Sequence, residues 1–311
     1  MNPAFSVVIF TTIAGAAQGL VVALAVALLA STTLAPGFAS ALLVLAAAML
    51  VVGLGASFLH LGRPERAWRA AMMWRTSWLS REVIVLPAFI GLIALWWLAL
   101  RWNLPAAWTQ IALPLAALVG AAVLWLCTAM IYACLRFIEE WAHPLTLVNF
   151  MLSGLASGFM LGAAVASIGG EEAFVRVVGP AALALTLIAW AARWSALRRN
   201  AAIRHKSTLQ SATGIHAPQL LQKSMGMSAG SFNTREFFHH VSTIAIKRVR
   251  LALVLLGFAL PSLLALVAIL SGALWLWLLA VAVQALGLVA DRWFFFAQAK
   301  HPQNLYYQVV S

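Results

Sequence analysis

Long apolar stretches separated by short polar joints run along this chain. Eight of them are long enough to cross a bilayer, which takes about 20 mostly apolar residues in a helix. The joints contain Gly or Pro, which commonly interrupt such runs, and lie at 36–37, 103–105, 143–144, 169–170, 179–180 and 271–272. We therefore predict one all-α integral membrane domain over residues 1–311, with spans at 5–30, 38–60, 82–101, 111–136, 145–168, 178–197, 249–270 and 273–296.

Composition and charge fit a membrane protein. Of all residues, 64% are apolar and 9% are charged, against about a quarter charged in soluble domains. The net charge of +12 comes from basic residues that cluster between the apolar runs, which argues against nucleic acid as a partner. The predicted spans put 18 of the 20 basic residues on one side. The positive-inside rule makes that side cytoplasmic, with both termini inside; a bound partner is another reason for some of these arginines.

The stretch 201–246 is the one sizeable segment expected outside the membrane. It is rich in Ser, Thr, Gln, Gly and His, a composition that also suits a disordered tether. Its apolar side chains favour a docking segment for a soluble partner, because exposed apolar groups call for a surface to pack on. They are Leu220, Leu221, Phe232, Phe237 and Phe238.

His60 and Glu82 stand where the second and third apolar runs meet the water. A histidine titrates near neutral pH, and a carboxylate is favoured at the start of a helix. Reduction of a quinone needs protons as well as electrons, and such a pair can relay them. The alternative is that His60 anchors the interface and Glu82 is a helix-terminal charge; the spacing favours neither reading.

Between these two residues, 64–74 resembles a short interfacial helix. Arg63, Arg66 and Arg69 recur every three residues, and Trp68 and Trp74 are placed like an aromatic belt. Anchoring to lipid headgroups is the simpler explanation of such a belt. The alternative is that the basic stripe binds an acidic partner or steers a quinone headgroup.

Polar residues inside the spans are few. Asn149, Ser153 and Ser157 follow one another at four-residue spacing and share a helix face. Such residues more often join helices than bind ligands, although Gln18 in the first span is a candidate quinone contact. Gly154 and Gly158, also four apart, indicate close helix packing.

The remaining ionisable residues suggest structural roles. Residues 136–143 hold a charged cap that we expect to be solvated, with proton entry as the alternative: Arg136, Glu139, Glu140 and His143. Asp291 and Arg292 suggest an adjacent or cross-helix ion pair. Cys127 and Cys134 are too few for a metal or disulfide framework, and no histidine pair faces another within the spans. We therefore expect no haem or metal in this chain.

Three blocks of sequence resemble the membrane anchor subunits of the dimethyl sulfoxide reductase family, within the polysulfide reductase-like anchors. They are NPAFSVVIFTTIAGAAQGL, HLGRPERAWRA with WRTSWLSREV, and STLQSATGIHAPQ with SAGSFNTREFFHH. The similarity covers nearly the whole chain. It implies a complex of three subunits, in which a molybdopterin catalytic subunit and a subunit with 4Fe–4S clusters sit on a haem-free anchor.

The resemblance also assigns the site. In that family, a His at the position of His60 and a Glu at that of Glu82 are associated with quinol binding. We expect these two to be catalytic and to bind ubiquinone or menaquinone, with Gln18, Arg63, Trp74 and Arg81 as further quinone contacts and lipid around the bundle. The iron–sulfur subunit would dock on the His60–Glu82 side and on 201–246.

The expected orientation favours one branch of this family. Respiratory dimethyl sulfoxide reductases face the periplasm, whereas the arginine distribution here places the site side in the cytoplasm, in a bacterial inner membrane. A cytoplasm-facing sulfite dehydrogenase, which reduces quinone, fits better than a reductase that oxidises menaquinol. This chain would not itself act on the terminal substrate. A transporter is disfavoured because paired broken helices are not evident and deep charges are few; a purely structural anchor is the third hypothesis.

Overall fold

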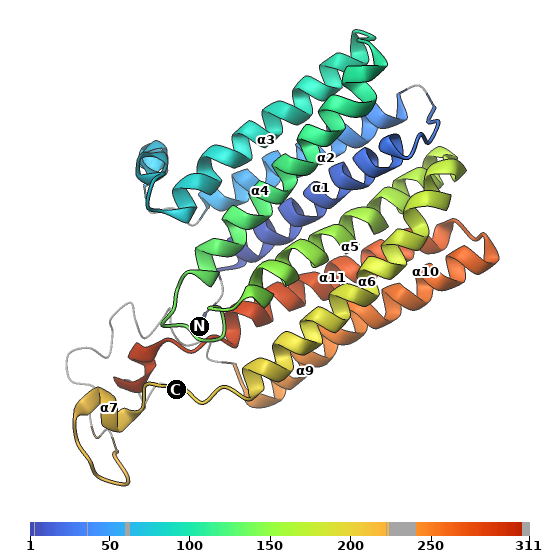
Figure 1. Ribbon diagram of the computed structural model, residues 1–311. Coiled ribbons are helices and arrows are strands. Elements are labelled where there is room, and N and C mark those ends of the chain that lie inside the picture. Colours follow the sequence, from blue (N-terminus) through green and yellow to red (C-terminus); the bar gives the residue numbers. More distant parts are fainter. Residues whose placement is uncertain (3, 36, 60–62, 222, 224–240, 307–311) are drawn as a thin grey trace.

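Figure 1 shows the computed structural model, in which long helices run side by side. The structure describes residues 1–311 except 3, 36, 60–62, 222, 224–240 and 307–311. Within these residues, eight helical segments are long and apolar enough to span a membrane, and none of the described residues forms a strand. The predicted all-α membrane bundle is confirmed. The spans are α1 (Phe5–Leu29), α2 (Phe38–Phe58), α3 (Trp78–Arg101), η2–α4 (Ala107–Ala133), α5 (Pro144–Gly169), α6 (Glu172–Ala201), α9–η4–α10 (Thr243–Ser271) and α11 (Trp275–Ala297).

Three short helices lie outside these spans: η1 (Pro64–Met73), α7 (Leu209–Thr213) and η5 (Pro302–Tyr306). The first two lie at the same end of the bundle as the start of α1 and the end of α11 (Figure 1). An even number of spans requires this arrangement. We call it the basic end, because most of the arginines and lysines outside the spans belong to its segments.

Two predicted helix boundaries were wrong. The α3 helix begins at Trp78, four residues early, because the Ser77 hydroxyl accepts a hydrogen bond from the Ser80 amide and caps it. The predicted joint at 179–180 does not exist, since α6 begins at Glu172 and continues through Pro180. Membrane helices tolerate such prolines, because nearby groups can satisfy the freed backbone carbonyl.

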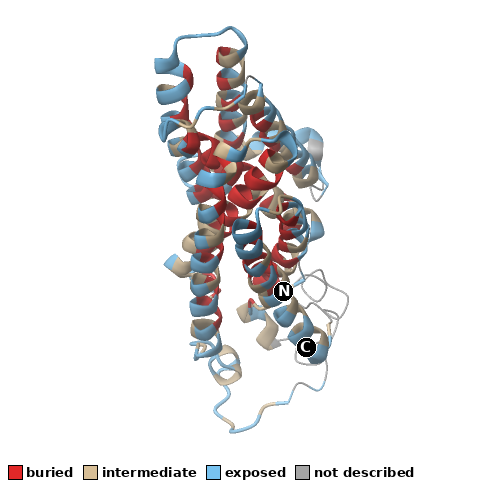
Figure 2. Ribbon diagram, turned by 90° about the vertical axis from the view of Figure 1, so that its right-hand side faces the viewer, coloured by how far each residue is buried: buried red, intermediate tan, exposed pale blue. Residues whose placement is uncertain are grey.

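Helix α1 joins the two halves of the bundle, packing against α2 and α4 on one side and against α5 and α11 on the other. Its contact with α5 is made by glycines, as predicted for Gly154 and Gly158. A Cβ atom added to Gly158 would lie 2.1 Å from the backbone carbon of Gly19, so the two backbones are in direct contact. Figure 2 shows the resulting buried core along the bundle, with exposed residues on the outer helix faces.

Candidate functional site

Glu82 lies four residues inside α3 rather than at its start, and its side chain is buried. The hydroxyl of Thr128 on α4 donates a hydrogen bond to its Oε1 atom. A carboxyl group at this depth is costly and is usually functional. Among the described residues, Glu82 thus has a neutral hydrogen-bond partner and forms no ion pair.

Arg81 and Trp74 meet at the rim of this site. The Arg81 side chain donates hydrogen bonds to the carbonyls of Trp74 and Arg75, both at 2.9 Å. Its guanidinium also lies over the Trp78 ring, 4.1 Å from the ring centroid. Arg81 therefore fixes the end of η1 against the start of α3, one residue from Glu82.

The η1 segment confirms the predicted short helix, although it is a 3₁₀-helix. Side chains three apart are eclipsed in a 3₁₀-helix, so Arg66 and Arg69 line up. Arg63 directly before it is exposed, as are Trp68 and Met72. This rim combines cationic and apolar surface.

The structure does not bring all predicted site residues together. His60 lies outside the described residues. Gln18 is buried and donates a hydrogen bond to the Ala14 carbonyl of its own helix, at 3.0 Å. It stands about 20 Å along α1, whereas Glu82 stands about 6 Å along α3 from the same end. Glu82, Arg81 and Trp74 form one locus, and Gln18 lies deeper.

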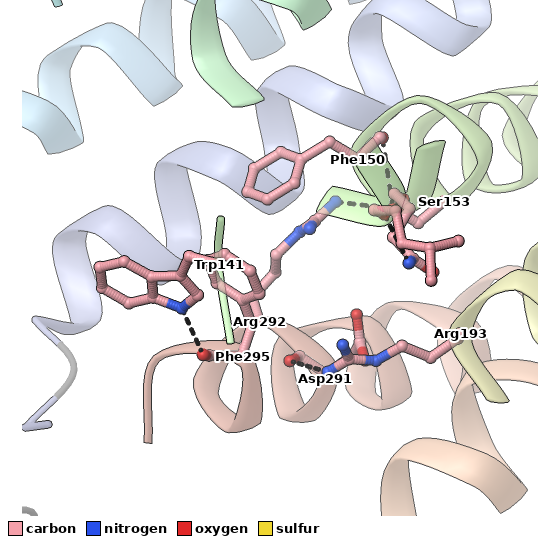
Figure 3. A network of polar contacts seen from close by, with 9 residues as sticks. Trp141, Phe150, Ser153, Arg193, Asp291, Arg292 and Phe295 are labelled. Atoms are coloured by element: carbon pink, nitrogen blue, oxygen red, sulfur yellow. Dashed lines mark hydrogen bonds and ion pairs between the residues drawn. The ribbon is translucent and has the colours of Figure 1, made fainter. Parts of the chain in front are cut away.

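A second set of buried charges was missed in the sequence (Figure 3). The prediction placed Arg193 in a loop, but it is buried in α6 and its Nε atom lies 2.5 Å from Asp291 Oδ1 on α11. The predicted cross-helix ion pair is therefore confirmed, with Arg193 as the partner. One signal was available: Arg193 shares a face with Thr186 and Ala189, which are also buried.

Arg292 points the other way from the Arg193–Asp291 pair. It donates a hydrogen bond of 2.6 Å to Ser153 Oγ, and its Cζ atom lies 3.8 Å from the centroid of the Phe150 ring. Ser153 in turn donates to the Asn149 carbonyl of its own helix. The polar face predicted on α5 thus joins α5 to α11.

The cap at 136–143 is not a solvated cluster. Glu140 is buried, and its Oε1 atom lies 3.6 Å from His205 Nε2. Burial lowers the pKa of the neighbouring His143, whose Nδ1 atom accepts a hydrogen bond from the Leu145 amide. Burial also lowers the pKa of the Met1 amine to about 6, against an opposing effect of Glu140. Several titratable groups therefore crowd the end of α11.

Metal binding finds no support in the part of the chain that the structure describes, where no three His, Cys, Asp or Glu side chains come together as ligands. A buried carboxyl group with a hydroxyl partner suits proton exchange with an organic carrier instead. Any redox metal would then belong to other subunits.

Comparison with known proteins gives a consistent result. The family model described as DMSO reductase anchor subunit (DmsC) matches residues 1–290. One component of the sulfite dehydrogenase of Allochromatium vinosum, its third-lettered subunit, is 46% identical, and the alignment covers 100% of both chains. The anaerobic dimethyl sulfoxide reductase chain YnfH of Escherichia coli is 30% identical over 38% of this chain and 41% of its own length.

Proposed function

Because the chain belongs to the DMSO reductase anchor subunit family, we propose that it is the quinone-reactive membrane subunit of a molybdopterin and iron–sulfur oxidoreductase. It would pass electrons between a subunit with 4Fe–4S clusters and quinone in the bilayer. The observation that carries this proposal is the buried carboxyl group of Glu82, bonded to Thr128 beside a basic, aromatic rim.

The chemistry follows from the needs of a quinone. A quinone that accepts two electrons also takes up two protons and becomes a neutral quinol. Glu82 would hold one proton at its carboxyl group, with Thr128 orienting the carboxyl, and His60 would supply or receive the other. Arg63, Arg81 and Trp74 would bind the head group at the rim, and Gln18 would contact a more deeply placed part of the molecule.

The full-length similarity to the Allochromatium vinosum sulfite dehydrogenase component supports sulfite oxidation coupled to quinone reduction. The alternative is an anchor that oxidises menaquinol for a dimethyl sulfoxide or related reductase, which the shorter match supports less strongly. The basic end would face the cytoplasm of a bacterial cell, and both chain termini would lie there.

The iron–sulfur subunit would dock at the basic end, with the catalytic subunit beyond it. Support comes from the exposed surface of η1, where Arg66 and Arg69 are accompanied by Trp68 and Met72. Apolar groups exposed among cations are typical of binding surfaces. The segment 201–246, of which α7 is one described part, would form the second docking element.

Replacing Glu82 tests the proposal. In the intact complex, Glu82→Gln should lower quinone-coupled turnover about a hundredfold or more, since loss of a proton carrier costs about that much. Turnover with a soluble artificial electron acceptor should be unchanged. Glu172→Gln, an exposed carboxylate at the other end of the bundle, is the matched control. Quinone-coupled turnover that survives Glu82→Gln would refute the proposal.

A further inference from the structure

A layer of polar side chains crosses the bundle at the depth of Glu82. Its members on α3, α4, α5, α6 and α11 stand four to eight residues from the basic end of their helices, which is about 6 to 12 Å. They are Glu82, Thr128, Asn149, Arg193, Asp291 and Arg292. Ionisable groups are rare at such depth, so a layer of them needs an explanation.

The layer is continuous from α3 to α11. Thr128 and Tyr132 stand four apart on one face of α4, and Tyr132 interacts electrostatically with both Glu82 and Arg292. The Tyr132 ring also stacks on Phe150 with centroids 5.7 Å apart, and Phe150 is the ring against which Arg292 lies. Asp291 and Arg193 continue the layer to α6.

An outer chamber of about 10 Å³, room for about one water, adjoins Arg193. Two buried atoms that face no hydrogen-bond partner belong to residues lining it, the acceptor Glu140 Oε2 and the donor Gln298 Nε2. A water molecule there would satisfy a donor and an acceptor at once. Glu140 itself reaches the surface through His205.

An inner chamber, also of about 10 Å³, adjoins Arg292. Thr11, Thr12, Ser153 and Ser157 line it together with this arginine. The indole Nε1 of Trp125, buried and without a hydrogen-bond partner, approaches Gly154 in its wall. Hydroxyl groups and an unpaired donor around a water-sized space indicate a second hydration site.

We propose that this layer carries protons sideways through the bundle, from Glu140 to Glu82. The inference rests on the proposed function, because it supplies the protons that Glu82 hands to quinone. One proton enters at Glu140 from the water outside for each proton that leaves Glu82, so the layer itself is unchanged after each passage. Water in the two chambers and the hydroxyls of Tyr132 and Thr128 would be the carriers.

Asp291 has a different part in this path. Arginine does not release its proton, and the positive charges of Arg193 and Arg292 would repel a passing proton. The Asp291 carboxylate, bonded to Arg193 and adjacent in sequence to Arg292, offsets that repulsion. It is a positioning residue that stays ionised.

The test compares Glu140→Gln with Glu139→Gln in the complete complex. Glu139 is the neighbouring carboxylate, and its Oε1 atom accepts a hydrogen bond from the Lys206 amide, which a glutamine oxygen can also do. Quinone-coupled and soluble-acceptor turnover are measured from about pH 6 to about pH 9, the range over which proton supply becomes limiting. Charged groups around Glu140 also enter the profile and are the same in both variants: the Met1 amine, His143, Arg193, Arg199 and His205.

We expect Glu140→Gln to lower quinone-coupled turnover about tenfold near pH 8.5 and much less near pH 6, where protons are abundant. Azide or formate, as small weak acids, should restore it, and soluble-acceptor turnover should stay normal. Asp291→Asn should give the same profile without rescue, because the repulsion remains. Glu139→Gln should match the unmodified complex.

A normal pH profile for both Glu140→Gln and Asp291→Asn would overturn the path while leaving the proposed function intact, provided that Glu82→Gln is inactive with quinone. Normal quinone turnover in Glu82→Gln would instead overturn the proposed function itself. If either variant loses turnover with both acceptors, assembly is damaged and the other variant decides.

Discussion

The edge between α3 and α4 and the interior between α5, α6 and α11 both bury charged groups, but they differ in how these groups are paired. At the edge, Glu82 has the neutral hydroxyl of Thr128. In the interior, Asp291 has the guanidinium of Arg193. A carboxyl group with a neutral partner can gain or lose a proton without stranding an opposite charge, whereas a buried ion pair is costly to break. Reactivity is therefore expected at the edge and rigidity in the interior.

The strongest way to test this contrast is to break the interior pair. Arg193→Ala leaves the Asp291 carboxylate buried without its partner, which costs about 3–5 kcal/mol. We expect a large loss of the chain from the membrane and a lower Tm of any purified complex.

Arg198→Ala, an exposed arginine of the same helix, provides the control. It should leave both the amount of protein and the Tm unchanged. If Arg193→Ala behaves like Arg198→Ala, the interior is not held together by this pair, and the contrast with the edge fails.

A smaller effect is expected where the two regions join. Gly158→Ala would place a Cβ atom against the backbone of Gly19, and backbone cannot move aside as a flexible side chain does. Overpacking of this kind costs about 1–3 kcal/mol. The Tm of the complex should fall, with quinone-coupled and soluble-acceptor turnover reduced in parallel.

Gly91→Ala in α3 is the matched substitution, because nothing lies within 4 Å of its added Cβ atom. It should leave the Tm unchanged or raise it slightly, since alanine favours the helix. Equal Tm values for the two variants would show that α1 and α5 can separate without loss.

The contrast also explains what the sequence could reveal. Apolar runs are long-range, redundant signals, so all eight spans were predictable. Helix starts depend on single contacts such as the Ser77 cap, and α3 was therefore placed four residues late. The edge site was predictable because Glu82, Arg81 and Trp74 are close in sequence and their motif resembles a known family.

The interior was harder to predict because its partners are far apart in the chain. Arg193 and Asp291 are separated by 98 residues, and nothing local distinguishes a buried arginine near a helix end from one in the adjoining loop. Glu140 shows the same difficulty, since a run of charged residues normally faces water. Only the packing of α11 against α5 and the loop at 136–143 decides their burial.

The smallest change separates reactivity from stability at the edge itself. Thr128→Val keeps the shape of the side chain and removes the hydroxyl that donates to Glu82. Hydrogen bonds between membrane helices contribute about 0.6 kcal/mol on average, so the Tm should hardly change. Orientation of the carboxyl group, however, depends on this bond, and a loss of about 1.4 kcal/mol in the transition state is a tenfold effect on rate. Quinone-coupled turnover should therefore fall about tenfold and recover in Thr128→Ser, with soluble-acceptor turnover constant throughout. A valine variant that destabilises the complex as much as Arg193→Ala would show that the edge is as structural as the interior.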